Sequence, residues 1–232
     1  DYYCNDRLRG FSLGAAHIMP GMDGDFENTF DHSREDSRCY FQRIELDRHG
    51  ITAESTVTRH VYLHRFAGQN SLKLVYPDGE AFAERDAVWV KLPLAGKRGR
   101  VMQYTCVKVS GGVRILAQEE NALVLAAPEE TVVTGAVSLI SFESAENSLR
   151  LEAAGFDELK ALAQRVWDAQ LEKICVTGGT EDKKTVFYTA MYRAFQRMTD
   201  FTEYGKYYSG FDGRVHEGVF YNNDGLWDTF RC

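Results

Sequence analysis

The spacing of apolar residues changes at Phe156, and this change constrains the fold more than any other feature of the sequence. From about Arg38 to Ser141, apolar side chains mostly recur at every second position. That is the period of a half-buried β-strand, whose successive side chains point to opposite faces of a sheet. After Phe156 they recur every three or four positions, which is the period of a helix. The sequence therefore predicts a β domain followed by helices.

Short segments with the strand period follow one another closely in the first part of the chain. In 51–58, for example, Ile51, Ala53, Ser55 and Val57 fall on one face. The same pattern occurs in 61–66, 71–77, 87–94, 101–109 and 135–143. Turn sequences rich in Gly, Pro and Asp interrupt it at 47–50, 77–79 and 110–112. Many short strands at close intervals predict antiparallel sheets packed as a β-sandwich.

Two helices are predicted after the strands. The first covers 156–174, and Asp157 can cap its start. Glycines at 178 and 179 then break the chain, and Thr180 is a plausible N-cap of a second helix with its own apolar stripe. A segment rich in Tyr and Gly follows at 203–218, with the pattern of a hairpin or an ordered loop.

Composition excludes several classes of partner. The formal net charge is -7 and the basic residues are dispersed, so no basic stripe is available to bind a nucleic acid. No run of about 18 apolar residues is present, so no membrane span is expected. The five cysteines are scattered singly, which argues against a zinc site and favours buried thiols. The oligomeric state stays open.

Three motifs near the end of the chain, in order, resemble the junction between sandwich and barrel in family 92 glycoside hydrolases. They are GGTEDKKTVFYTAMYRAF from 178, YSGFDGRVH from 208 and LWDTFR from 226. Earlier segments fit too, because 10–12 reads GFS, and Thr-Arg at 58–59 followed by His-Arg-Phe at 64–66 resembles the T-x-R…HRF strand of that family. The resemblance covers most of the chain and is most specific over the last third.

The resemblance implies a mainly β fold in which an antiparallel β-sandwich is followed by a linker helix and the start of an (α/α)6 barrel. We expect a sandwich domain at 1–145, a helical linker at 146–177 and the beginning of the catalytic barrel at 178–232. The sequence ends inside the aromatic stretch YNNDGLWDTFRC, whereas chain ends are usually polar. We therefore expect the remainder of the barrel to lie beyond Cys232.

Members of the family are calcium-dependent exo-acting α-mannosidases. The resemblance thus implies that the protein removes terminal α-linked mannose from a glycan by an inverting mechanism. Such a mechanism places a general acid and a general base on opposite sides of the glycosidic bond, about 6.5–9.5 Å apart. By resemblance the acid, the base and the calcium ligands are expected beyond Cys232, and no metal ligand is expected in this chain. A periplasmic or secreted location is also implied.

Asp228 is the first candidate for substrate binding. It matches the family aspartate that accepts hydrogen bonds from hydroxyls of the terminal mannose, and Trp227 could offer an apolar platform to the sugar. An alternative is a local ion pair between Asp228 and Arg231, which are three residues apart.

The chain departs from the family pattern at two places that the resemblance puts on the leaving-group side of the pocket. The family usually has His-Thr-His where this chain has 13–15 as Leu-Gly-Ala, and the nearest imidazole is His17. Asp224 and Gly225 precede Leu226 where the family commonly has an aromatic residue and Ser.

Other polar residues favour structural roles. The sequence predicts that Asp212 is a turn residue and that His216 lies on the return strand of a hairpin. His60 and His64, if in one strand, are about 13 Å apart and too distant to share a metal. The acidic residues at 23, 25 and 27 lack the later glutamate of a calcium loop, so a solvated loop is expected.

Two other functions stay open at the level of sequence. One is a non-catalytic β-sandwich that binds carbohydrate or acts as a scaffold. The other is a different glycosidase or phosphorylase with a sandwich and a barrel but no calcium, which chelation of divalent ions would distinguish.

Overall fold

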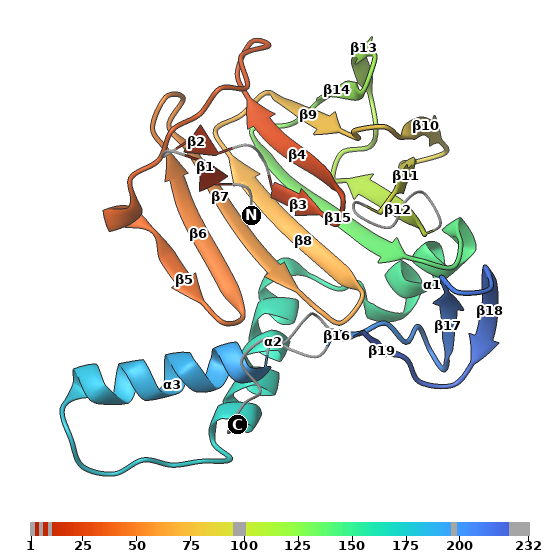
Figure 1. Ribbon diagram of the computed structural model, residues 1–232. Helices are drawn as coiled ribbons and strands as arrows, with labels where there is room; N and C mark the ends of the chain where they lie inside the picture. Colours follow the sequence, from red (N-terminus) through yellow and green to blue (C-terminus); the bar gives the residue numbers. More distant parts are fainter. Residues whose placement is uncertain (1–2, 5–6, 9–10, 95–100, 196–198, 223–232) are drawn as a thin grey trace. The chain divides into compact units, whose positions relative to one another are not determined.

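The computed structural model describes residues 3–4, 7–8, 11–94, 101–195 and 199–222. The chain forms two compact units, Asp1–Ala163 and Gln164–Cys232, which are considered separately. The first unit is a β-sandwich with helices following it, so the predicted fold class is confirmed (Figure 1). No helix in the described ranges is long and apolar enough to cross a membrane.

The larger sheet of the first unit has eight antiparallel strands in the order β10-β11-β12-β15-β8-β7-β6-β5. Their bounds are β5 Asp36–Arg38, β6 Phe41–Leu46, β7 Ile51–Val57, β8 Val61–Ala67, β10 Glu80–Glu84, β11 Ala87–Pro93, β12 Met102–Val109 and β15 Glu130–Ser138. Leu46 pairs with Ile51 across the turn predicted at 47–50. The other two predicted turns likewise lie between strands, at 77–79 and 110–112.

The smaller sheet has five antiparallel strands in the order β13-β14-β9-β4-β3. Their bounds are β3 Phe11–Leu13, β4 Ala16–Gly21, β9 Ser71–Val75, β13 Ile115–Glu119 and β14 Ala122–Ala126. A separate two-stranded pair, β1 Tyr3–Cys4 with β2 Arg7–Leu8, precedes it. One turn of 3-10 helix, His32–Arg34, follows β4 and is capped by the side chain of Asp31.

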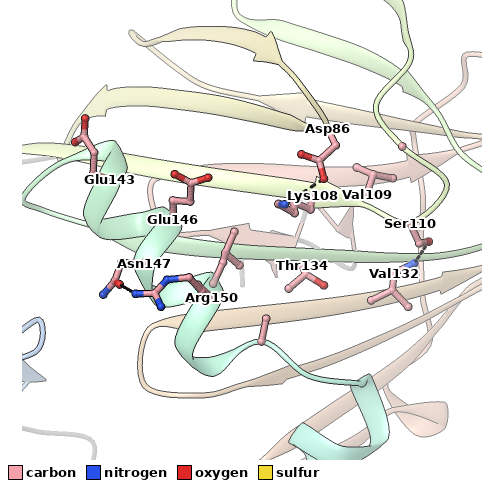
Figure 2. A pocket seen from close by; sticks show the side chains of 13 residues that line it. Asp86, Lys108, Val109, Ser110, Val132, Thr134, Glu143, Glu146, Asn147 and Arg150 are labelled. Atoms are coloured by element: carbon pink, nitrogen blue, oxygen red, sulfur yellow. Dashed lines mark hydrogen bonds and ion pairs between the residues drawn. The ribbon is translucent and has the colours of Figure 1, made fainter.

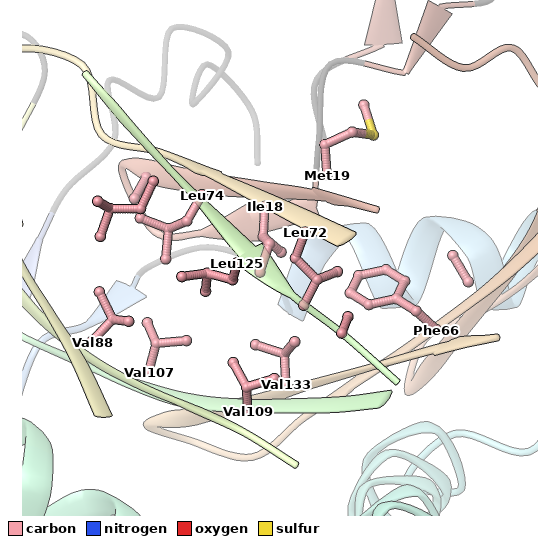
Figure 3. Packing of buried hydrophobic residues seen from close by; sticks show 14 of the residues in the cluster. Ile18, Met19, Phe66, Leu72, Leu74, Val88, Val107, Val109, Leu125 and Val133 are labelled. Atoms are coloured by element: carbon pink, nitrogen blue, oxygen red, sulfur yellow. The ribbon is translucent and has the colours of Figure 1, made fainter. Parts of the chain in front are cut away.

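The main core lies between the two sheets. Figure 3 shows Ile18, Leu72, Leu74 and Leu125 of the smaller sheet facing valines and Phe66 of the larger one. Most of these side chains are completely buried, because the period of two directs every second residue of each strand into this layer. Burial of one such side chain contributes about 1.5–3 kcal/mol, so this layer provides the main stabilisation of the unit.

A second apolar layer covers the outer face of the larger sheet. Val61 and Leu63 of β8 lie in it together with Leu149 of helix α1 (Phe142–Glu152) and Leu159 of helix α2 (Phe156–Leu171). The central strands are therefore buried on both faces. In β8, Tyr62 and His64 are buried as well as Val61 and Leu63, which explains why the strict alternation is lost there.

Helix α1 replaces the end of a predicted strand. The sequence suggested that a strand continues through 135–143, but β15 ends at Ser138 and α1 begins at Phe142. The hydroxyl of Ser138 accepts hydrogen bonds from the backbone N–H groups of Ile140 (2.9 Å) and Ser141 (3.3 Å). Ser141 then caps the helix by accepting from the N–H of Ser144 at 3.2 Å. These serine side chains end the strand and start the helix.

Helix α2 starts one residue before the predicted cap. Asp157 lies in its first turn instead of at the N-cap, and its carboxylate accepts a hydrogen bond from Arg65 at 3.1 Å. The same guanidinium pairs with Glu54 at 2.6 Å and lies 4.2 Å from the centre of the Phe156 ring. This ion pair and the cation–π contact hold the start of α2 to strand β8.

The second unit contains the end of α2, helix α3 (Glu181–Phe195) and four short strands. Thr180 accepts a hydrogen bond from the N–H of Lys183 at 3.3 Å, so the predicted cap of α3 is confirmed. Trp167 of α2 packs edge-on against Tyr192 of α3, with ring centres 4.9 Å apart. No residue of α3 is buried, and 69% of Val186 is exposed. The predicted apolar stripe of this helix thus lies open in the described residues.

Candidate functional site

The two predicted sugar-binding residues, Trp227 and Asp228, lie outside the described residues. The structure describes the segment that leads to them, from β16 (Thr199–Asp200) to β19 (Tyr221–Asn222). These two strands pair antiparallel and join the two ends of the segment. The candidate site is therefore built from the elements that precede Asp228 and from the other polar positions that the sequence singled out.

A hairpin projects from the paired strands β16 and β19. It consists of β17 (Lys206–Ser209) and β18 (Arg214–Glu217), whose outer pairs are Lys206 with Glu217 and Ser209 with Arg214. The hairpin predicted at 203–218 is thus confirmed. Gly213 has a φ of +72°, a left-handed conformation that favours glycine, and this explains the Asp-Gly pair at the tip.

The carboxylate of Asp212 organises the tip of the hairpin. It accepts a hydrogen bond from the N–H of Arg214 at 3.2 Å, and its Oδ2 atom lies 2.9 Å from Nε2 of His216. Desolvation acts to raise the pKa of Asp212, but hydrogen bonds from Ser209, Arg214 and His216 outweigh it and lower the pKa. Asp212 is therefore an ionised turn residue, and His216 lies on the return strand as predicted.

Aromatic rings stack along the base of the hairpin. The ring of Tyr207 stacks with those of His216 and Phe220, with centres 5.5 Å and 5.1 Å away and planes inclined by 26° and 14°. Phe220 is also held through its backbone, because its N–H donates to the hydroxyl of Thr202 at 3.0 Å and its carbonyl accepts from Phe201 at 2.9 Å. The stack and these bonds fix the hairpin on the β16–β19 pair.

The loop that resembles the family's GFS segment forms a tight hairpin. Phe11–Leu13 is strand β3, and Leu13 pairs with Ala16 so that only Gly14 and Ala15 form the turn. Gly14 has a φ of +78°, and a Cβ at this position would collide with the side chain of Gln103. Where the family usually has His-Thr-His, this chain therefore has a two-residue turn that requires glycine.

Gln103 holds this turn, although nothing in the sequence pointed to it. Its side-chain oxygen accepts from the N–H of Ala15 at 2.8 Å, and its amide nitrogen donates to Thr105 at 2.9 Å. Gln103 and Thr105 are both buried. They lie on β12, 88 residues from the turn, so the only signal in the sequence was a pair of polar residues in an apolar strand.

His17, the imidazole nearest to this turn, lies in β4 opposite Ser12 and Val75. Burial lowers its pKa, so the imidazole is neutral at pH 7. A neutral, half-buried histidine within a sheet fits a structural role.

His60 and His64 do not share a strand, because β8 begins at Val61. Nδ1 of His60 lies 2.5 Å from Oε1 of Glu152 at the end of α1. Nδ1 of His64 lies 2.8 Å from the hydroxyl of Ser55, and the His64 ring stacks on Tyr62. Both histidines have structural partners, as the sequence suggested.

The carboxylates of the acidic loop at 23–27 are bound by neighbouring side chains. Arg48 pairs with Asp25 at 2.7 Å and with Glu27 at 3.1 Å, and Asn70 donates to Asp23 at 2.7 Å. No group of three or more His, Cys, Asp and Glu side chains in the described ranges is arranged to hold a metal ion. The acidic residues at 23, 25 and 27 therefore do not fit a calcium site.

A hollow of about 1040 Å³ lies beside α1 on the outer face of the larger sheet. Figure 2 shows its acidic residues Asp86, Glu143 and Glu146 with Lys108 and Arg150 among them. Lys108 pairs with Asp86 at 3.1 Å, and this hydrogen bond lowers the pKa of Asp86. Hydrogen bonding to Ser141 likewise lowers the pKa of Glu143. Both carboxyls are ionised at neutral pH and lack the proton that a general acid must donate.

Comparison with known proteins connects this architecture to one family. Residues 144–232 match the glycosyl hydrolase family 92 catalytic domain. No curated protein matches the chain. Three solved structures of the same family are similar in fold.

The first is an inverting mannosidase from Bacteroides thetaiotaomicron VPI-5482, with 20% identity and a TM-score of 0.85. It is matched by 98% of the present chain, which covers 38% of that protein. The second is an α-mannosidase from Bacteroides thetaiotaomicron, with 18% identity, a TM-score of 0.74 and coverages of 90% and 36%. The third is the glycosyl hydrolase ccman5, with 18% identity, a TM-score of 0.75 and coverages of 93% and 36%.

The resemblance to family 92 is therefore confirmed for the N-terminal part of that family. At these identities the structures establish the fold. The chain spans less than two fifths of the length of each of the three relatives.

Proposed function

We propose that this chain is the N-terminal part of a glycoside hydrolase that removes terminal α-linked mannose from glycans. The observation that carries the proposal is the match of residues 144–232 to the family 92 catalytic domain, in a chain whose fold follows that of family 92 mannosidases along nearly its whole length. The chain alone is expected to be inactive, because the catalytic carboxylates are proposed to lie beyond Cys232.

The proposed reaction inverts the anomeric configuration. One carboxyl group protonates the glycosidic oxygen, and a second carboxylate on the opposite face of the sugar activates a water molecule. The two groups must be about 6.5–9.5 Å apart to leave room for that water. Calcium, when bound, would contribute a hard cation for the vicinal hydroxyls of mannose, with ligands also proposed beyond Cys232.

The described residues contribute a scaffold and a rigid approach to the sugar. Asp228 is proposed to accept hydrogen bonds from two hydroxyls of the terminal mannose, and Trp227 to pack on its apolar face. The β16–β19 pair and the stacked hairpin end at Asn222, six residues before Asp228. A sugar-binding carboxylate must be held within a fraction of an ångström, and rigid elements next to it provide that support. The barrel that would complete the site and the periplasmic or secreted location belong to the same proposal.

The test is an assay of the full-length protein on α-linked mannobioses, with the product anomer followed by NMR from the first minutes of reaction. The proposal expects β-mannose as the first product and loss of activity after chelation, restored by calcium. Release of α-mannose would refute inversion, and full activity in chelator would refute the role of calcium.

A mature polypeptide of about 26.3 kDa that binds mannosides without cleaving them would favour a non-catalytic carbohydrate-binding sandwich instead. Activity on other α-linked sugars with none on mannosides would retain a glycoside hydrolase and reject mannose as its substrate.

A further inference from the structure

We draw no further inference here: the strongest candidate, the hollow beside α1 on the outer face of the larger sheet, carries none because the chain spans less than two fifths of the length of its relatives and nothing in the structure shows what covers that face.

Discussion

Oε1 of Glu152 lies 2.5 Å from Nδ1 of His60, although 92 residues separate them. The other carboxylate oxygen accepts from the hydroxyl of Thr58 at 2.5 Å and from the N–H of His60 at 3.0 Å. The side chains of Glu152 and His60 are largely buried, with 17% and 11% of their surface exposed. One glutamate thus connects the end of α1 to the turn that precedes β8.

Glu152→Ala is expected to destabilise the first unit by about 1–3 kcal/mol, because it removes the acceptor of part-buried donors on Thr58 and His60. The free energy of unfolding in urea measures the loss. Glu146→Ala, at an exposed position of the same helix, is the control and is expected to change it by less than about 0.5 kcal/mol. Equal effects of the two substitutions would contradict the role of Glu152.

Tyr62→Phe is expected to leave stability unchanged or raise it by about 1 kcal/mol. Within the described ranges the hydroxyl of Tyr62 has no hydrogen-bond partner, and burial raises its pKa well above the ordinary value. Gly135→Ala is expected to have the opposite effect on stability. A Cβ at 135 would collide with the Tyr62 ring, so a loss of about 1–3 kcal/mol is expected in urea unfolding. A clear loss in Tyr62→Phe would instead reveal a partner for the hydroxyl.

The sequence predicted the strands well where one face is buried, and less well where both are. In β7 the alternation of Ile51 and Ala53 with polar residues was readable, since one face of that strand meets the core. The helical linker was expected to begin at 146, so the first turn of α1 was missed, although Phe142, Ala145 and Leu149 recur at helical spacing. Its first residues were included in the predicted strand that became β15, and that strand ends where the hydroxyl of Ser138 accepts from the N–H of Ile140.

Long-range polar contacts were beyond prediction for a different reason. Gln103 bonds Ala15, and Arg65 bonds Asp157, through pairings that depend on which strands become neighbours. Periodicity describes one segment at a time and contains no information about its partner. By contrast, the apolar stripe of α3 could be predicted from its own segment, although no residue of that helix is buried.

Cys106 gives a pH dependence whose sign follows from its burial. Burial raises the pKa of its thiol to about 12, whereas an unfolded cysteine ionises near about 8.5. Between these values the unfolded chain loses a proton that the folded chain retains, so the free energy of unfolding falls as pH rises. The contribution of Cys106 to the free energy of unfolding is fully present below about pH 8.5 and is lost progressively toward pH 12.

The measurement compares urea unfolding of the wild type and of Cys106→Ala from pH 7 to 11. The variant is less stable at pH 7 because it leaves a cavity, but its stability should decline less steeply above pH 9. Curves that stay parallel throughout would contradict the raised pKa. In a separate check, iodoacetamide at pH 8 should modify the exposed Cys175 and leave Cys106 intact until the protein unfolds.

The open apolar face of α3 predicts how residues 1–232 behave when produced alone. Val186 and Phe195 are 69% and 42% exposed, and Ile174 in the preceding loop is 52% exposed. We expect this polypeptide to bind the dye ANS and to associate. Val186→Lys, which places a charge on that face, should reduce both effects in dye fluorescence and light scattering. A monomer that unfolds sharply and binds no dye would argue that α3 needs no further partner.

Asp228→Ala in the full-length protein is expected to lower kcat/KM on an α-mannoside by a factor that corresponds to about 2–4 kcal/mol of transition-state stabilisation. The carboxylate is proposed to accept hydrogen bonds from two sugar hydroxyls, and an alanine accepts none. Asp228→Asn keeps the shape and one acceptor, so it should recover part of the loss. Arg231→Ala separates this role from a local ion pair with Arg231. If Asp228 serves only in the ion pair, Asp228→Ala and Arg231→Ala lose similar stability, and kcat/KM falls only in proportion to the fraction of folded protein. If Asp228 contacts the sugar, kcat/KM falls in the Asp228 variants alone.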